Sequence, residues 1–255
     1  MNARKLLPAS LLVLLLAGGC ARALAPPRQP IGADAQRLIG LLTARWQAFS
    51  DLRTLVDIDL TRGGERQQLA GVLLARAPDS VRFEALSPFG QPLLIVSIHG
   101  GQLTAYNATT NEGLMGPATA DTAARLLSLP FEPEDLVGVL AGRVQPPKDL
   151  RVATVEPADQ QGPSLELIGG LHRKRVWMDP ETGAVSQVEI TGGRYEARVT
   201  YRRGADAHPS GFDLTAAQSY LTGAVRYRDP VFDGGVDPER FRLTIPEGAK
   251  IERLR

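Results

Sequence analysis

The spacing of apolar residues divides the chain into helical and extended segments. In residues 34–49 the apolar positions fall three and four apart, which predicts an amphipathic helix. In residues 52–62 the period changes to two, as in a strand with one buried face. Gly63 and Gly64 then predict a hairpin turn. Four more strands are predicted in this half, at residues 69–77, 81–86, 91–100 and 102–107.

Two short helices are predicted in the middle of the chain. The first, residues 119–129, has Thr119 or Asp121 as a possible N-cap. Its packing face consists of leucines: Leu126, Leu127 and Leu129. The second, residues 131–143, has a proline early in its first turn and a glycine at its end, which are typical helix start and stop signals.

The last hundred residues again favour strands. They are predicted at residues 150–156, 163–169, 172–179, 184–191, 194–201, 223–229 and 240–246. Short strands that follow one another closely favour antiparallel pairing over crossover connections. We therefore predict a mainly β (α+β) fold, an unclosed and strongly curved antiparallel β-barrel. An N-terminal helix and two short lid helices would cover its mouth or concave side, and the interior would hold an apolar cavity.

A turn in the sequence Leu-Ser-Pro-Phe-Gly carries an unusual residue at its tip. Pro88 restricts its own φ and Gly90 can adopt a positive one, so a tight turn is expected there. Phe89 places a large aromatic ring between them, where a polar side chain is usual. The ring either folds back into a core or reaches outward, and we expect it to point outward.

The first twenty residues have the layout of a secretory signal. Two basic residues precede an apolar stretch that ends in Gly18 and Gly19, directly before Cys20. A cysteine in this place resembles the lipobox of bacterial lipoproteins, in which the new N-terminal cysteine carries the lipid. The alternative is an ordinary cleaved signal in which the cysteine occurs by chance. Residues 1–19 are thus predicted to be a signal peptide and Cys20 to be lipidated.

The predicted signal peptide also determines the predicted division of the remaining chain and its location. Residues 20–33 are rich in proline and polar residues and are predicted to be the lipidated N-terminus and tether. Residues 34–255 are predicted to form one open-barrel domain. Ala21 stands after the cysteine, where lipoproteins retained at the inner membrane commonly have aspartate, so the resemblance implies the periplasmic face of the outer membrane. Cys20 is the single cysteine, so no disulfide can form within the chain.

Charge gives no reason to expect a nucleic-acid partner. The formal net charge is +1, and basic residues do not form a stripe interleaved with aromatics. The basic runs at residues 173–175 and 202–203 lie in strand contexts and are interpreted as solvated outer faces.

No arrangement of residues indicates catalysis. Asp57 and Asp59 are two apart on a predicted strand, so they share its outer face and are expected to be solvated there. His99, His172 and His208 have no metal-ligand spacing. The chain also lacks a Gly-x-Ser-x-Gly motif and a phosphate-binding glycine loop. We expect no enzyme activity, cofactor or metal, and we expect a monomer.

Three segments, in this order, resemble the LolA/LolB fold of lipoprotein-localisation factors. Residues 82–93 resemble the family's strand, Pro-aliphatic-Gly turn and next strand. Residues 119–143 resemble its paired lid helices, and residues 176–190 resemble a hairpin in its second half. LolB is the nearer match because this chain also resembles a lipoprotein. Two features depart from the pattern: Val139 where LolB proteins often have tryptophan, and a long stretch at residues 204–220.

The resemblance implies transfer without covalent chemistry. A LolB-like protein would bind acyl chains of a lipoprotein or lipid, receive cargo from a periplasmic LolA-like carrier, and release it into the outer membrane. Phe89, with Pro88 and Gly90, takes the place of the family's protruding, membrane-engaging turn. The expected cavity lining, which would equally suit an ordinary core, is Val56, Ile58, Leu60, Leu73 and Phe83. The alternatives are a lipid-sensing or envelope-assembly binding lipoprotein without transport activity and, ranked last, an envelope hydrolase.

Overall fold

The computed structural model of the protein describes residues 25–127, 131–170, 172–192, 195–204 and 208–254. Cys20 and the predicted signal peptide, residues 1–19, lie outside the described residues. The leucine face predicted for the first lid helix lies outside them too: Leu129 is not described, nor are the side chains of Leu126 and Leu127.

Helices are few. They are α1 (Ala33–Gln47), α2 (Ala120–Leu127) and α3 (Pro133–Ala141), with the short 3₁₀ helices η1 (Ala217–Ser219) and η2 (Pro238–Phe241). Strands make up most of the remainder. They are β1 (Asp51–Arg62), β2 (Glu65–Arg76), β3 (Ser80–Leu86), β4 (Pro92–His99), β5 (Gln102–Asn107), β6 (Glu112–Pro117), β7 (Val152–Asp159), β8 (Gly162–Ile168), β9 (Arg173–Met178), β10 (Val185–Gly192), β11 (Tyr195–Arg203), β12 (Pro209–Ala216), β13 (Leu221–Phe232) and β14 (Lys250–Arg253).

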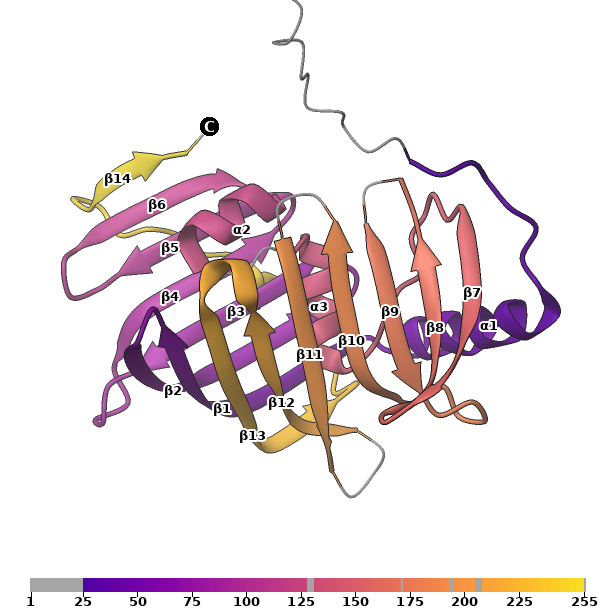
Figure 1. The fold of residues 1–255 in the computed structure, drawn as a ribbon. Helices are drawn as coiled ribbons and strands as arrows, with labels where there is room; N and C mark the ends of the chain where they lie inside the picture. The colour runs from indigo at the N-terminus through magenta and orange to yellow at the C-terminus, as the bar shows by residue number, and fades with distance from the viewer. Residues whose placement is uncertain (1–24, 128–130, 171, 193–194, 205–207, 255) are drawn as a thin grey trace, which may run out of the picture.

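All of these strands belong to one curved sheet (Figure 1). Its order is β14-β6-β5-β4-β3-β2-β1-β13-β12-β11-β10-β9-β8-β7, and every neighbouring pair is antiparallel except β14 with β6. Strands β7 and β14 are the two edges, so the sheet curls without closing into a barrel. The mainly β, unclosed antiparallel architecture predicted from the sequence is confirmed.

The two halves of the sheet meet at β1 and β13. These strands pair from Leu52 with Phe232 to Arg62 with Leu221, residues that are 180 and 159 positions apart in the sequence. The register shifts between Arg53 and Leu55. Apart from the parallel pair of β14 with β6, the other neighbours are hairpins between strands adjacent in sequence, so the β1–β13 ladder joins the two runs of hairpins.

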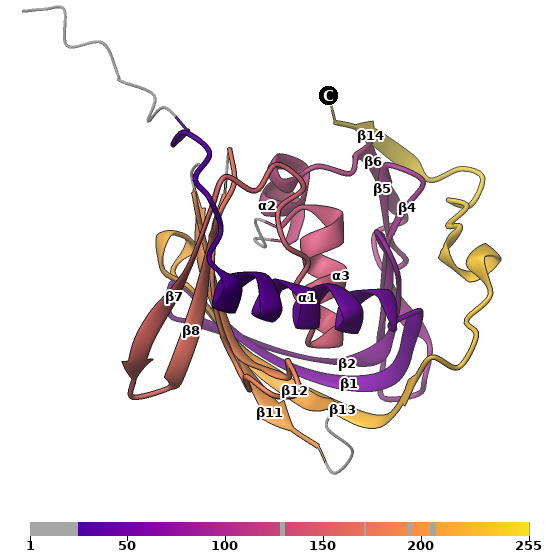
Figure 2. The same ribbon diagram turned by 90° about the vertical axis from the view of Figure 1, so that its right-hand side faces the viewer.

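The three α-helices lie within the curve of the sheet (Figure 2). Helix α1 buries Leu38, Leu42 and Trp46, and α3 buries Val137, in the same core cluster as the inward residues of the strands. Helix α3 follows its predicted signals. It has a proline in its first turn, and it ends at Gly142, whose φ of +65° is a conformation that favours glycine.

Ion pairs between neighbouring strands lie on the convex face of the sheet. Asp57 pairs with Arg228 at 3.0 Å, and Asp59 pairs with Arg66. The hydrogen bond from Arg66 lowers the pKa of Asp59 below its ordinary value. Both aspartates lie on the outer face, as the period-two pattern predicted, and their partners are arginines of the sheet.

The prediction of a strand at residues 240–246 is wrong, because these residues form the end of η2 and an irregular segment. After β13 the chain crosses the convex side of the sheet, shown in yellow at the right of Figure 2, before it joins β6 as β14. In this segment Phe241 is fully buried against Leu74 and Val236, and its carbonyl accepts a hydrogen bond from the Ser97 hydroxyl. Side-chain packing and side-chain hydrogen bonds, not a backbone ladder, hold the segment in place.

Candidate functional site

Several hairpin turns meet at one end of the curved sheet, here called the mouth rim. Because neighbouring strands are antiparallel, alternate turns fall on the same side. The mouth rim consists of the turns at residues 63–64, 87–91, 108–111 and 217–220 together with the end of β8. The opposite end, here called the base, carries the turns at residues 77–79, 100–101, 160–161 and 179–184.

The apolar interior becomes more open toward the mouth rim. Along β1 the inward side chains change from Leu52 and Val56, which are fully buried, to Ile58 and Leu60, which are partly exposed. Phe83 on β3 is also partly exposed and packs against the same core. The inner face of these central strands therefore presents apolar side chains to solvent near the rim.

The predicted cavity-lining residues all lie on this inner face. Val56 and Leu73 belong to the buried core cluster, and Ile58, Leu60 and Phe83 pack against it. The structure thus brings all five together in one apolar body. Their role as the lining for an acyl chain stays a prediction.

The Phe89 turn is held rigidly by its own hydrogen bonds. The Ser87 amide donates to the Gln91 carbonyl at 2.8 Å, and the Gly90 amide donates to the Ser87 carbonyl at 2.9 Å. The Ser87 hydroxyl oxygen accepts from the amides of Phe89 and Gln91. Gly90 has a φ of +78°, and the Phe89 side chain is 91% exposed. The ring therefore extends outward from an ordered turn on the mouth rim.

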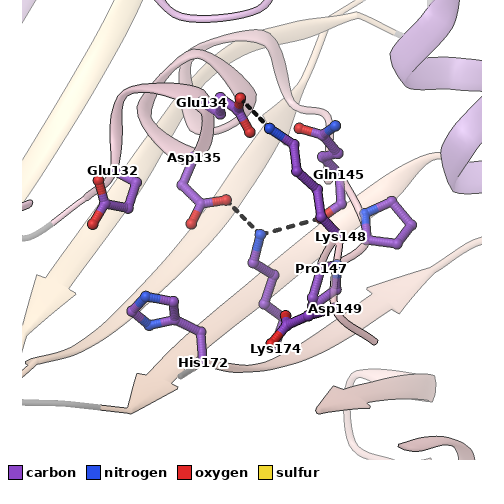
Figure 3. Close-up of a pocket in the computed structure, with 10 residues that line it drawn as sticks. Glu132, Glu134, Asp135, Gln145, Pro147, Lys148, Asp149, His172 and Lys174 are labelled. Carbon is purple, nitrogen blue, oxygen red and sulfur yellow. Dashed lines mark hydrogen bonds and ion pairs between the residues drawn. The ribbon is translucent and has the colours of Figure 1, made fainter. Parts of the chain in front are cut away.

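A polar pocket of about 240 Å³ lies beside the first turn of α3 (Figure 3). The start of α3, the loop that follows α3 and the start of β9 form its walls. Its lining residues are Glu132, Glu134, Asp135, Gln145, Pro146, Pro147, Lys148, Asp149, His172 and Lys174. A second, much smaller pocket shares Glu132, Asp135 and His172 with it and is also lined by Phe131, Ile190 and Ala197, so the polar pocket adjoins the apolar interior.

A buried ion pair lies in this pocket. The Lys174 ammonium donates to the Asp135 carboxylate and, at 3.1 Å, to the Gln145 carbonyl. The side chains of Lys174 and Asp135 are 7% and 16% exposed, and the contacts join β9 to α3 and to the loop after it. A second pair, Lys148 with Glu134 at 2.7 Å, lies in the same pocket but is much more exposed.

The sequence interpretation of Lys174 as part of a solvated outer face is wrong. Side chains alternate along a strand, so Arg173 and Arg175 point outward while Lys174 points inward. The sequence does indicate that Lys174 points inward, because it alternates in step with the apolar residues Val176 and Met178 on the inner face of β9. Its partner Asp135 comes from another part of the chain, and no sequence pattern indicated that contact.

A second buried cation lies toward the base. Arg143 follows the C-terminus of α3 and is 8% exposed, and its Nε atom has no hydrogen-bond partner among the described residues. The buried hydroxyl of Tyr201 also lacks a partner within the described part of the chain. Burial and the nearby charge of Arg45 lower the pKa of Arg143 to about 10.

Known structures share this fold. A DUF1329 family protein from Desulfovibrio piger has a TM-score of 0.60 at 11% identity, covering 84% of this chain and 98% of that one. A LolA superfamily protein from Nitrosomonas europaea has a TM-score of 0.57 at 12% identity, covering 82% and 97%. A domain from Vibrio parahaemolyticus described as outer membrane lipoprotein-sorting has a TM-score of 0.56 at 15% identity, covering 81% and 97%.

These likenesses define the chain as an open-barrel protein with the fold of the LolA superfamily. The LolA/LolB-type fold predicted from the sequence is thereby confirmed. No protein-family model and no curated protein matches the chain. Among the described residues no helix is long and apolar enough to span a membrane, and no group of side chains is arranged to hold a metal ion.

The buried ion pair makes a testable contribution to stability. Replacing Asp135→Asn leaves the Lys174 ammonium buried without its counter-charge, so we expect a loss of about 3–5 kcal/mol in the free energy of unfolding. Glu134→Gln, which breaks the exposed pair in the same pocket, is expected to cost about 1 kcal/mol or less. Urea unfolding measures both. Equal losses in the two variants would contradict a buried, mutually dependent pair.

Removing the buried charge of Arg143 is expected to raise the free energy of unfolding, in contrast to the loss expected for Asp135→Asn. The lowered pKa of Arg143 means that the folded state disfavours its charged form. Burial of this charge therefore destabilises the protein below pH 10, and the destabilisation decreases as the pH rises above that value. Arg143→Met is expected to stabilise the protein at pH 7 by about 1–3 kcal/mol, and the gain should shrink above pH 10. Thermal unfolding across this range, with exposed Arg240→Met as control, tests it. A destabilised Arg143→Met variant would show that the charge is compensated.

Proposed function

We propose that this protein is a lipid-anchored lipoprotein of the outer membrane. In this proposal it binds the acyl chains of other lipoproteins in its apolar interior and inserts those lipoproteins into the membrane. A periplasmic carrier of the LolA type would supply the cargo. The fold shared with a lipoprotein-sorting domain and a LolA superfamily protein supports this class of function. No bond is made or broken in such a transfer, so no catalytic residue, cofactor or metal is required.

The observation that carries the proposal is the position of Phe89. The ring is 91% exposed on the mouth rim, the same end at which the apolar interior becomes accessible. Burying one such side chain in a bilayer contributes roughly 1.5–3 kcal/mol. That is too little to hold a protein at a membrane, but it is enough to orient a protein that a lipid already tethers.

Acyl chains would enter between the helices and the inner face of the sheet. The core residues there are closely packed in this structure, so entry requires α2 and α3 to move away from the central strands. The Lys174–Asp135 pair joins α3 to β9 at the rim end, and it would separate or stretch in that movement.

The predicted lipid on Cys20 would attach the protein to the membrane. Several buried acyl chains give stable attachment, since each buried CH₂ contributes about 0.8 kcal/mol. With Ala21 after the cysteine, the outer membrane is the proposed location, and the protein would act as a monomer facing the periplasm.

The closely packed interior favours a second candidate function. A protein of this fold whose core stays filled would sense lipids or assist envelope assembly by binding a partner, without transporting cargo. The two candidates differ in whether the interior ever holds an acyl chain.

Bound lipid distinguishes these candidates. We expect a soluble form that starts at residue 20 with Cys20→Ala to co-purify with acyl lipid or lipopeptide, detectable by native and denaturing mass spectrometry. A Leu73→Glu variant should reduce the bound lipid, because it places a charge on the inner face. Consistent absence of lipid, combined with failure to take up an added acylated peptide, would sink the carrier proposal and favour the second candidate.

Phe89 is the critical residue for delivery. Phe89→Glu should leave the unfolding temperature unchanged, because the side chain is exposed, and should reduce transfer of a labelled lipoprotein into phospholipid vesicles by roughly tenfold or more. Gln91→Glu adds the same charge to the same turn and is the matched control. Unimpaired transfer by Phe89→Glu would show that the turn does not engage the membrane.

A further inference from the structure

A second aromatic side chain stands out on the mouth rim. Among the described residues the most exposed large apolar side chains are Phe89 at 91% and Tyr220 at 79%, while the next, Ile251, is only 45% exposed. Tyr220 lies in the turn between β12 and β13. Both of the strongly exposed rings therefore belong to turns of the same end of the sheet.

The sheet register places the two rings a defined distance apart. Strands β3, β2, β1 and β13 separate the Phe89 turn from the Tyr220 turn. Neighbouring strands are about 4.8 Å apart, so the two turns are about 20 Å apart across the sheet. The register places Ala85 level with Tyr227, so the Phe89 turn is also offset from the Tyr220 turn by roughly 10–15 Å along the strands. The Gly63 amide donates to the Tyr220 carbonyl at 3.2 Å, which joins the Tyr220 turn to the hairpin turn between β1 and β2. The intervening rim is continuous hydrogen-bonded structure.

The backbone at Tyr220 is unfavourable for a tyrosine. Its φ of +50° and ψ of +35° lie in the left-handed region, where glycine and asparagine are preferred and a bulky side chain is disfavoured. Local turn chemistry therefore does not explain the residue at this position. The ring is also exposed, so packing does not explain it either. A tyrosine in a disfavoured backbone conformation, with its ring directed into solvent, motivates the hypothesis of an interaction outside the chain.

The N-terminal segment indicates what that interaction is. The Gln29 amide donates to the Arg151 carbonyl at 2.8 Å, and the Arg151 guanidinium donates to the Pro26 carbonyl at 3.1 Å. Arg151 in turn donates its amide to Ile168 at the end of β8, which is part of the mouth rim. Cys20 precedes Pro26 by six residues, a span of at most about 20 Å. A lipid on Cys20 is therefore within reach of a bilayer at the mouth rim.

We propose that Tyr220 is a second bilayer-contacting side chain, so that the mouth rim rests on the membrane at both Phe89 and Tyr220. The inference rests on the proposed membrane-delivery function and names a further residue of its contact surface. A tyrosine suits this position, because its ring can lie among the acyl chains while its hydroxyl stays at the headgroups. Near the Tyr220 turn, Arg62 lies opposite Glu65 in the backbone ladder, so charges of both signs flank the ring, and we expect the contact to depend little on salt.

Probe labelling tests the proposal on the soluble form with Cys20→Ala, which has no other cysteine. Phe89→Cys, Tyr220→Cys and Gln161→Cys variants, each with an environment-sensitive fluorophore, are mixed with phosphatidylethanolamine–phosphatidylglycerol vesicles that contain brominated lipid. Probes at 89 and 220 should both shift to the blue and be quenched. The probe at 161, an exposed position at the base, should not change.

The outcomes separate this proposal from the one it rests on. A probe at 220 that stays in water while the probe at 89 is quenched would overturn the role of Tyr220 and leave the Phe89 contact intact. If neither probe is quenched, the membrane contact of the proposed function fails as well.

Tyr220→Asn provides a second test that does not depend on a probe. Asparagine suits the left-handed backbone, so the fold should be at least as stable, while vesicle binding should weaken by about tenfold. Tyr220→Trp should keep full binding. Unchanged binding by Tyr220→Asn, or a change in its sedimentation coefficient in place of its binding, would overturn the proposal and assign the ring to no contact or to a protein contact.

Discussion

The pairing of β1 with β13 is the constraint on which the rest of the molecule depends. The strands from β1 to β6 and from β7 to β13 can form from local hairpins, whereas this ladder pairs residues 159 to 180 positions apart and joins the two runs. Thr54 supports it through a hydrogen bond to the Arg228 carbonyl, and Asp57 supports it through the ion pair with Arg228. Closing so long a loop is entropically costly, and the ladder with the core it encloses offsets that cost. A shift of one residue would turn the apolar face of β1 outward.

The β1–β13 ladder also separates an apolar inner face of the sheet from a charged outer face. Its inward residues meet α1 and α3 in one apolar core, whereas its outward residues form ion pairs in water. Two cations are nevertheless buried on the inner side. Lys174, near the rim, has a carboxylate partner, whereas Arg143, toward the base, has none among the described residues at its Nε. The partnered cation lies where the proposed function needs a contact that can separate, and the base is closed by packing.

The fold was predictable because alternation of apolar residues is a local signal. It located α1, both middle helices and most strands. The misses have physical causes. Strand β6 contains Gly113 and Gly116, which Ile245 and Leu254 cover, so it lacks an apolar alternation of its own. Strand β12 includes Gly211, which lies close to the β13 backbone, and β14 is polar. Residues 240–246 alternate like a strand, yet they pack across the convex face, a placement that depends on partners far away in the sequence.

The same distinction between local and distant signals applies to the candidate site. The exposure of Phe89 follows from the turn that holds it, with Pro88 and Gly90 on either side, and five residues suffice to predict it. Tyr220 gives no comparable signal, because its relation to Phe89 exists only once β13 pairs with β1. The pairing of β13 with β1 also affects how the protein would be oriented on a membrane. One inserted ring leaves a tethered protein free to tilt, whereas two rings separated by about four strand spacings, together with a lipid anchor that can reach the same membrane, would limit its orientation. A rim held in that orientation would open the apolar interior directly toward the bilayer.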